Sequence, residues 1–258
     1  MNLLMKRMFS LIVFLWMLSP VHAQEVAKDE EINKEKKENN FDKSQVIKWN
    51  PVSIKFGKIS MFGEFNYRPR RSFTLGIGIP FDYQNEYTIN DDRQDVTTQT
   101  LSLMAGYRMY MGKKPVSGFY FEPYLKYVKN DIESFIFTDL DNDPVIFRGT
   151  SKYSGFGVGA QLGVQLLIGR KIAIDFFFLG PEANLSKVNV EARDITSSSW
   201  DAQDAADAQQ KIEDIVKDIP VIGDNIKVDV DASTRRVTAD YKGFLPGFRA
   251  GVSVGVRF

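Results

Sequence analysis

Residues 244–258, FLPGFRAGVSVGVRF, alternate between apolar side chains and small or charged ones down to the last residue. Successive side chains of a β-strand point to opposite faces, so a period of two indicates a strand between two different environments. The even positions form one continuous apolar face: Phe244, Pro246, Phe248, Ala250, Val252, Val254, Val256 and Phe258. The segment therefore predicts a strand that is apolar on one side and polar on the other.

The same alternation recurs at residues 72–81, 100–109, 118–127 and 155–166. A soluble β-sandwich that turns its polar faces to water is one interpretation. A membrane β-barrel with its polar faces inside is the favoured one. The apolar faces run for about 9–11 residues, which spans a bilayer when the strand is tilted, and aromatic residues gather toward the strand ends.

The polar faces carry a charged residue in most of these strands. In a barrel these side chains point inward, and we expect them to pair there, because an unpaired buried charge costs several kcal/mol. A polar gate or a solute path is the alternative role for this predicted charge cluster. Its members are Glu64, Arg108, Glu122, Lys126, Asp175, Arg249 and Arg257.

The connections between the predicted strands alternate in length, as short periplasmic turns and long outer loops do in bacterial barrels. The short ones are 68–71, 112–117 and 169–171, and the long ones are 85–97, 131–150 and 191–240. Two periplasmic termini require an even number of strands, so Val46 to Phe56 is assigned as the first strand although Pro51 interrupts it. The prediction is an all-β protein, an eight-stranded antiparallel transmembrane up-and-down β-barrel over residues 46–258. The interior of such a barrel is just filled by side chains, which argues against an open channel.

The connection 191–240 is far longer than usual loops and carries twelve acidic against six basic residues. Residues 199–219 are predicted as its one helix, with Asp201 and Asp204 near the start and Pro220 after the end. A cap or a partner site on the outer side is one role for this loop. Simple packing on the barrel rim is the other.

The N-terminus has the three-part order of a secretory signal peptide over residues 1–23: the basic pair Lys6-Arg7, an apolar stretch from Met8 to Leu18, and Val21-His22-Ala23 at the cleavage site. Residues 24–45 are highly charged and poor in apolar groups, which predicts a periplasmic tether; a short solvated helix is the alternative. Export together with membrane strands predicts the outer membrane of a Gram-negative envelope as the location.

The composition narrows the chemistry. The 258 residues include 33 basic and 33 acidic side chains, no cysteine and one histidine, His22, which leaves with the predicted signal peptide. Histidine-dependent nucleophilic catalysis, histidine or cysteine metal sites and thiol chemistry are then excluded for the mature chain. The sequence predicts a protein that is not an enzyme, with no metal and no cofactor, and the balanced charge is unlike that of a nucleic-acid-binding protein.

Two motifs have simpler explanations. Residues 251–255, GVSVG, match the nucleophile elbow of serine hydrolases, but they lie inside an alternating strand with no helix after it. Residues 139–143 resemble the start of a calcium loop, yet Pro144 stands where the turn needs glycine and Thr150 where a glutamate is needed.

Several segments resemble a family of small bacterial outer-membrane β-barrel proteins of unknown function. They are 107–115 (YRMYMGKKP), 117–120 (SGFY), 123–124 (PY), 48–51 (KWNP), 163–169 leading to Asp175, and 178–181 (FLGP). The family commonly has Tyr-Glu in its second strand, whereas this chain has Gly63-Glu64. The resemblance implies a barrel in the outer membrane and no catalytic residues.

The expected function is non-enzymatic: envelope anchoring or surface contacts through the outer loops, with a narrow pore or carrier for small solutes as the alternative. The expected partners are outer-membrane lipid, a surface partner through 191–240, and the barrel-assembly machinery, for which the C-terminal strand ending in Phe258 is the predicted signal.

Overall fold

The structure is a computed structural model and describes residues 43–89, 92–112, 114–140, 143–196, 226–231 and 233–258. All of the described residues belong to one compact unit, Lys43–Phe258. The predicted signal peptide 1–23, almost all of the predicted tether 24–45 and the predicted helix 199–219 lie outside the described residues. No helix in the described part is both long and apolar enough to cross a membrane.

The described chain forms one antiparallel sheet of ten strands and one short 3-10 helix, η1 (Pro51–Phe56). The strands are β1 (Gln45–Asn50), β2 (Lys58–Arg68), β3 (Arg71–Pro80), β4 (Tyr83–Ile89), β5 (Asp92–Tyr110), β6 (Gly118–Leu140), β7 (Asp143–Ile168), β8 (Ile172–Asp194), β9 (Ile226–Asp231) and β10 (Arg236–Arg257).

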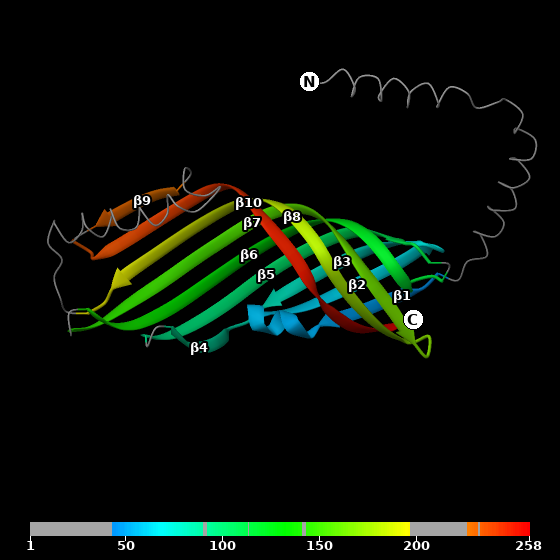
Figure 1. Cartoon of the computed structure of the whole chain (residues 1–258), viewed down its shortest axis with the longest axis horizontal. Helices are drawn as coiled ribbons and strands as arrows, with labels where there is room; N and C mark the ends of the chain where they lie inside the picture. Colours follow the sequence, from blue (N-terminus) through cyan, green and yellow to red (C-terminus); the bar gives the residue numbers. More distant parts are fainter. Residues whose placement is uncertain (1–42, 90–91, 113, 141–142, 197–225, 232) are drawn as a thin grey trace, which may run out of the picture. The chain divides into compact units, whose positions relative to one another are not determined.

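The sheet closes into a ring (Figure 1). Neighbouring strands follow the order β1-β2-β3-β5-β6-β7-β8-β10, and β10 pairs back with β1 from Val46↔Arg257 to Trp49↔Val254. Among the described strands, β4 pairs only with β5, and β9 only with β10. The prediction of eight strands is therefore wrong for the sheet as a whole, although the closed circuit of pairings passes through eight of the ten. The additional strands arise in segments that were expected to be loops.

The three predicted short connections join β2 to β3, β5 to β6 and β7 to β8. They lie at the same end of the ring as the C-terminus, where the Arg257 N–H donates to the Lys171 carbonyl at 2.7 Å and the Phe258 N–H to the Gln45 carbonyl at 2.8 Å. We call this end the turn end and the opposite one the hairpin end.

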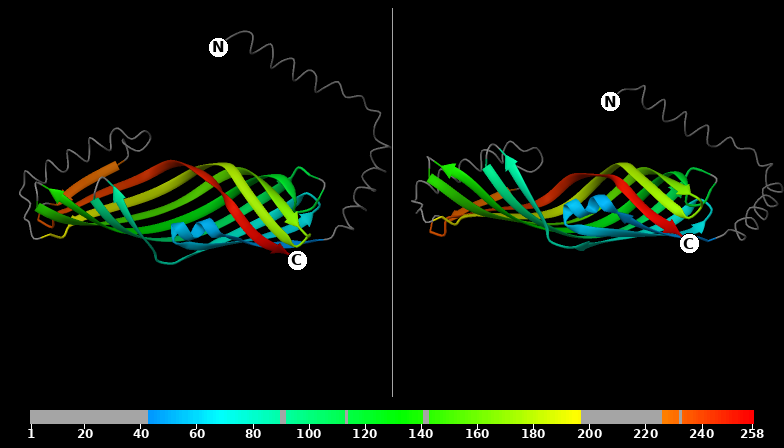
Figure 2. Two further views of the ribbon diagram at one scale, coloured as in Figure 1. Left: turned by 60° about the horizontal axis from the view of Figure 1, so that its bottom comes forward. Right: turned by 90° about the horizontal axis from the view of Figure 1, so that it is seen from below.

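The long strands continue past β1, β2 and β3 toward the hairpin end (Figure 2). β6 and β7 stay paired from Gly118↔Gln165 to Leu140↔Asp143, and β4 and β5 from Tyr83↔Thr98 to Ile89↔Asp92. The expected loops 85–97 and 131–150 are thus mainly strand. The expected loop 191–240 likewise begins later, because β8 runs to Asp194, and it contains β9 and the start of β10. Alternation of apolar and polar residues ends at a solvent boundary, but backbone pairing does not depend on it.

The expected first strand, 46–56, is a strand only as far as Asn50. Pro51 has no N–H for the sheet but fits the first turn of η1, which ends at Gly57 with a left-handed φ of 62°. A side chain at Gly57 would clash with the Thr98 carbonyl. The Gly57 carbonyl in turn accepts hydrogen bonds from the Phe81 and Thr100 N–H groups, both at 3.0 Å, which fixes η1 against β5.

The two faces of the ring are the reverse of those of a soluble protein. Large apolar side chains of every ring strand are exposed on the outside, among them Ile47, Met61, Leu75, Leu103, Leu125, Val158, Phe176 and Val254. Charged side chains are buried inside, where Glu64 and Glu122 are 0% exposed and Arg108 is 3% exposed. The sandwich interpretation, in which these charges face water, is therefore wrong.

The apolar exterior, which we call the apolar belt, ends abruptly toward the hairpin end. Its last row is Tyr127, Phe156, Leu185 and Phe244, which are direct register partners across β6, β7, β8 and β10. All four are exposed. Two residues further along each strand the outward positions are polar: Lys129, Ser154, Lys187 and Lys242.

Candidate functional site: a buried ion network inside the ring

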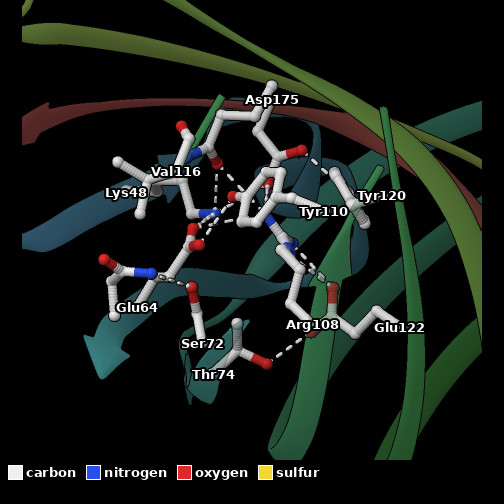
Figure 3. Close-up of polar contacts among 12 residues, drawn as sticks. Lys48, Glu64, Ser72, Thr74, Arg108, Tyr110, Val116, Tyr120, Glu122 and Asp175 are labelled. Carbon is white, nitrogen blue, oxygen red and sulfur yellow. Dashed lines mark hydrogen bonds and ion pairs between the residues drawn. The ribbon is translucent and has the colours of Figure 1, made fainter. Parts of the chain in front are cut away.

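Arg108 of β5 is the centre of a buried polar cluster inside the ring (Figure 3). Its Nε and Nη2 donate to Glu122 Oε2 at 2.9 and 2.7 Å. Its Nη1 lies 2.9 Å from Asp175 Oδ2 and 3.3 Å from Glu64 Oε2. The guanidinium carbon also lies 3.7 Å from the centroid of the Tyr120 ring, a cation–π contact. One cation thus contacts three carboxylates from β2, β6 and β8.

Lys48 of β1 is the second cation. Its Nζ donates to Asp175 Oδ2 at 2.7 Å, to Gln165 Oε1 at 2.8 Å and to Glu64 Oε2 at 3.0 Å. Lys48 is 2% exposed, and all three donor hydrogens of an ammonium group have an acceptor here. Because Asp175 and Glu64 also bind Arg108, the two cations share two carboxylates.

Neutral side chains donate the remaining hydrogen bonds to the carboxylate oxygens. The Tyr110 hydroxyl donates to Glu64 Oε1 at 2.6 Å, and the Tyr120 hydroxyl to Asp175 Oδ1 at 2.7 Å. Gln161 donates to Glu122 Oε2 at 2.9 Å, and Thr74 to Glu122 Oε1. Every carboxylate oxygen of the cluster therefore has a donor. We call this set the interior network: Lys48, Glu64, Thr74, Arg108, Tyr110, Tyr120, Glu122, Gln161, Gln165 and Asp175.

The interior network is held by small residues on the same inward face. A Cβ at Gly106 would lie 2.5 Å from both Glu122 Oε1 and Thr74 Oγ1, and one at Gly163 would clash with the Tyr120 hydroxyl. Because interiors are close-packed, large side chains on one strand require small ones on the next. The glycines of the polar face therefore leave the space that the side chains of the network occupy.

Of the predicted charge cluster, the structure brings together Glu64, Arg108, Glu122 and Asp175. Lys126 lies apart and forms an ion pair with Glu182, which also accepts a hydrogen bond from the Tyr124 hydroxyl at 2.9 Å.

Arg249 joins the edge of the interior network without a carboxylate. Its Nη1 donates to Gln161 Oε1 at 2.7 Å. Its guanidinium carbon lies 4.5 to 5.4 Å from the ring centroids of Phe177, Tyr124 and Phe62.

Two further predicted residues lie at the turn end. Arg257 is half-buried near the end of β10, and within the described chain its side chain has no hydrogen bond or ion pair. The predicted assembly-signal residue, Phe258, is 72% exposed and closes the β1 edge through its backbone bonds with Gln45.

Sequence reasoning missed six members of the interior network, as well as Glu182: Lys48, Thr74, Tyr110, Tyr120, Gln161 and Gln165. Lys48 was overlooked because alternation is poor across 46–56 when that whole segment is taken as a strand. The signal was nevertheless present: Val46 and Lys48 alternate with Ile47 and Trp49 up to Pro51. The neutral side chains lie on the predicted polar faces, or directly after one in the case of Tyr110, but only the acidic and basic residues of those faces were considered.

The arrangement leaves little room for a ligand. A cavity of about 10 Å³ lies between the network and Arg249, which is space for about one water molecule. In the described part of the chain, no three His, Asp or Glu side chains are grouped so that they would hold a metal ion. The described geometry is that of a packed, mutually satisfied core.

No family model matches the chain, and no curated protein matches its sequence. Among solved structures, the chain is similar to the crystal structure of Acinetobacter baumannii CarO, at 10% sequence identity and a TM-score of 0.43, over 84% of this chain and 97% of that one. The resemblance to a family of small outer-membrane barrels therefore stays a prediction.

Proposed function

We propose that this chain is a non-enzymatic β-barrel protein of the bacterial outer membrane that anchors in the envelope and makes surface contacts through its outer hairpins. The observation that carries the proposal is the inverted ring, apolar outside and charged inside. Soluble proteins rarely expose contiguous apolar surface beyond a few hundred Å². A closed ring also leaves no unpaired strand edge in lipid, as a membrane-spanning sheet requires.

The height of the apolar belt fits a bilayer. On β7 the outward apolar residues run from Phe156 to Ile168. At about 3.3 Å per residue this is about 40 Å along the strand, and about 30 Å after a strand tilt of roughly 40°. The hydrocarbon core of a membrane is about 30 Å thick.

Aromatic side chains lie near both ends of the belt. Toward the turn end, the Tyr67 and Phe73 rings stack at 5.0 Å, and the Tyr107 ring packs edge-on against Phe73 at 5.4 Å. Toward the hairpin end, Tyr127, Phe156 and Phe244 stand in the last apolar row. Two aromatic girdles are typical of outer-membrane barrels, where these rings sit at the lipid–water interfaces.

The strands beyond the belt supply the surface for contacts. Past the Lys129↔Ser154 pair, β6 and β7 continue as a hairpin to Leu140↔Asp143, with exposed ion pairs such as Arg148–Glu133. With a periplasmic turn end, which the predicted export signal and tether favour, this hairpin and the acidic segment 191–240 lie outside the cell. A surface partner through 191–240 is part of the proposal.

The interior network supports anchoring rather than conduction. It joins side chains from β1, β2, β3, β5, β6, β7 and β8 across the middle of the ring. We expect the purified protein to give no steady conductance in a planar bilayer. A stable, reproducible channel from the wild-type chain would favour the narrow-pore alternative instead.

Orientation and exposure are tested by thiol labelling of intact cells, because the chain has no cysteine of its own. We expect a membrane-impermeant maleimide to label Lys152→Cys on β7 and to leave Lys114→Cys, in a short turn, unlabelled until the outer membrane is permeabilised. Both positions are exposed, which makes them a matched pair. Labelling of Lys114→Cys alone would show that the orientation is opposite to the proposed one. Labelling of neither variant before permeabilisation would refute surface display.

A further inference from the structure

A row of lysines follows directly on the apolar belt. The row lies one register step toward the hairpin end from Tyr127, Phe156, Leu185 and Phe244, and consists of Lys129, Ser154, Lys187 and Lys242. All three lysines are exposed on the outward face. Two residues of strand rise about 7 Å, so the row stands where the hydrocarbon region ends. We call these residues the lysine row.

The described residues provide few carboxylate partners for this row. Lys187 is directly opposite Lys242 in the β8–β10 ladder, and like charges in that position repel. Within the described chain, neither forms an ion pair with a carboxylate. Lys129 does, with Asp131 at 3.2 Å, but this pair is more than one third exposed. The Asp240 carboxylate one step further accepts a hydrogen bond from Asn189 at 2.7 Å.

A second basic row, farther from the belt, is arranged differently. Arg148, Arg193 and Arg236 are register partners across β7, β8 and β10. Here an acidic row stands beside the cations: Arg148 pairs with Glu133 at 3.6 Å, and Arg236 with Glu191 at 4.0 Å. Within the described chain, two of the three arginines of the outer row thus pair with a carboxylate, against one of the three lysines at the end of the apolar belt.

We infer that the lysine row binds the phosphate groups of lipid headgroups in the outer leaflet. This inference rests on the proposed membrane-spanning function. Three features support it: the row is continuous with the apolar belt, its charge is complementary to a phosphate, and lysine side chains extend along apolar surface to place an ammonium group at a headgroup. Each lysine near an anionic membrane surface contributes about fivefold in affinity.

The test measures lipid preference directly. The full chain is refolded into phosphatidylcholine vesicles, and the association of spin-labelled phosphatidylglycerol relative to spin-labelled phosphatidylcholine is measured. In parallel, the protein is taken from vesicles doped with lipid A and heated in detergent. The temperature at which its mobility in gel electrophoresis changes is then measured. We expect the wild type to prefer both anionic lipids. The triple variant K129Q/K187Q/K242Q should lose roughly tenfold or more of the phosphatidylglycerol preference.

The matched control is R148Q/R193Q/R236Q, which removes the same number of positive charges from the arginine row. We expect it to keep the preference within about threefold, because its cations stand farther from the boundary and beside carboxylates. The basic short turns are unchanged in both variants. An equal loss in the two variants, or no loss in the lysine variant, would overturn the inference.

Two further outcomes are separable. If the wild type does not insert into phosphatidylcholine vesicles at all, the proposed membrane function fails; if it inserts and shows no anionic preference, only the lipid inference fails. Inorganic phosphate is compared with chloride at equal ionic strength. Phosphate could raise the temperature of the mobility change of the wild type in pure phosphatidylcholine as much as lipid A does. In that case the row binds free anions and the lipid assignment is wrong.

Discussion

Two groups of ion pairs in this molecule use the same side chains in opposite surroundings. The pairs of the interior network are buried, with Glu64 at 0% and Arg108 at 4% side-chain exposure. The pairs on the hairpins are open to water, with Arg148 at 52% and Glu133 at 57%. Water screens the second group and competes with it, so such pairs contribute about 0–1 kcal/mol each. In the first group water does not solvate the charges, so each charged group depends on its protein partners.

The difference shows that burial changes how ion pairs affect stability. Moving an ion pair out of water costs about as much as the attraction returns, so the network as a whole adds little net stability over an apolar core. Its parts are nevertheless strongly interdependent, since removal of one partner leaves uncompensated buried charge. The hairpin pairs are independent of one another and easily replaced.

The largest expected effect is that of Arg108→Met. This change leaves Glu64, Glu122 and Asp175 with one cation, Lys48, and we expect the free energy of unfolding to fall by about 3–5 kcal/mol. Urea unfolding in lipid vesicles, followed by tryptophan fluorescence, measures it. The control Arg148→Met should change it by less than about 1 kcal/mol. Equal effects of the two variants would remove the distinction between the groups.

The next prediction concerns the charge balance within the network. Its two cations, Lys48 and Arg108, face three carboxylates, so Lys48→Met increases the imbalance while Glu64→Gln removes it. We expect a loss of about 3 kcal/mol or more for Lys48→Met. For Glu64→Gln we expect about 1–3 kcal/mol, because glutamine has one acceptor oxygen where the carboxylate has two for the donors of Tyr110, Lys48 and Arg108. The same unfolding assay ranks the two, and the reverse order would contradict the charge argument.

A smaller effect is expected for the hairpin pairs. Glu133→Gln should lower stability by less than about 1 kcal/mol, and raising the salt to about 1 M should remove even that, because the Debye length falls to about 3 Å. The stability loss caused by Glu64→Gln should persist at this salt concentration, since buried pairs are screened much less. A large, salt-independent loss for Glu133→Gln would show that this hairpin is buried in the folded protein.

The smallest effect is local and depends on pH. In the β9–β10 hairpin, hydrogen bonds from the Ser233 hydroxyl and then the Thr234 hydroxyl lower the pKa of the Asp231 carboxyl from 3.8 to about 2. A lowered pKa means that the carboxylate favours the folded turn fully above about pH 4 and loses this contribution as the pH falls through about 2. The amide NMR signals of Ser233 and Thr234 should titrate with a midpoint near pH 2. A midpoint near 4, or a titration near pH 2 that persists in Asp231→Asn, would contradict these bonds.

Much of the ring was predictable from the sequence. Alternation placed Phe156, Val158 and Leu166 outside and Gln161 and Gln165 inside, and the short turns were located correctly. The ten-stranded sheet was not, because beyond the belt both faces of a strand meet water and the alternation disappears while the backbone pairing continues.

The site was predictable only in part. Period two identified Glu64, Arg108, Glu122 and Asp175 as inward charges, but it does not say which strands meet inside a closed ring. Arg257 shares the face of Arg249 yet lies at the turn end, opposite Val46, and has no side-chain partner in the described chain. The partnership of Lys48 with Asp175, 127 residues apart, follows from the closure of β1 on β10. Closure is a property of the whole sheet.

The central claim, that the apolar belt lies in lipid and the hairpins in water, is tested most directly by a spin-label scan along β7. Single cysteines are introduced from Arg148 to Ile168 in vesicles, and collision with oxygen is compared with collision with a water-soluble nickel complex. We predict oxygen access at the outward positions Val158, Leu162 and Leu166, nickel access at Arg148 and Lys152, and a crossover between Ser154 and Phe156. Nickel access at every outward position would contradict the account, because the belt would then face water.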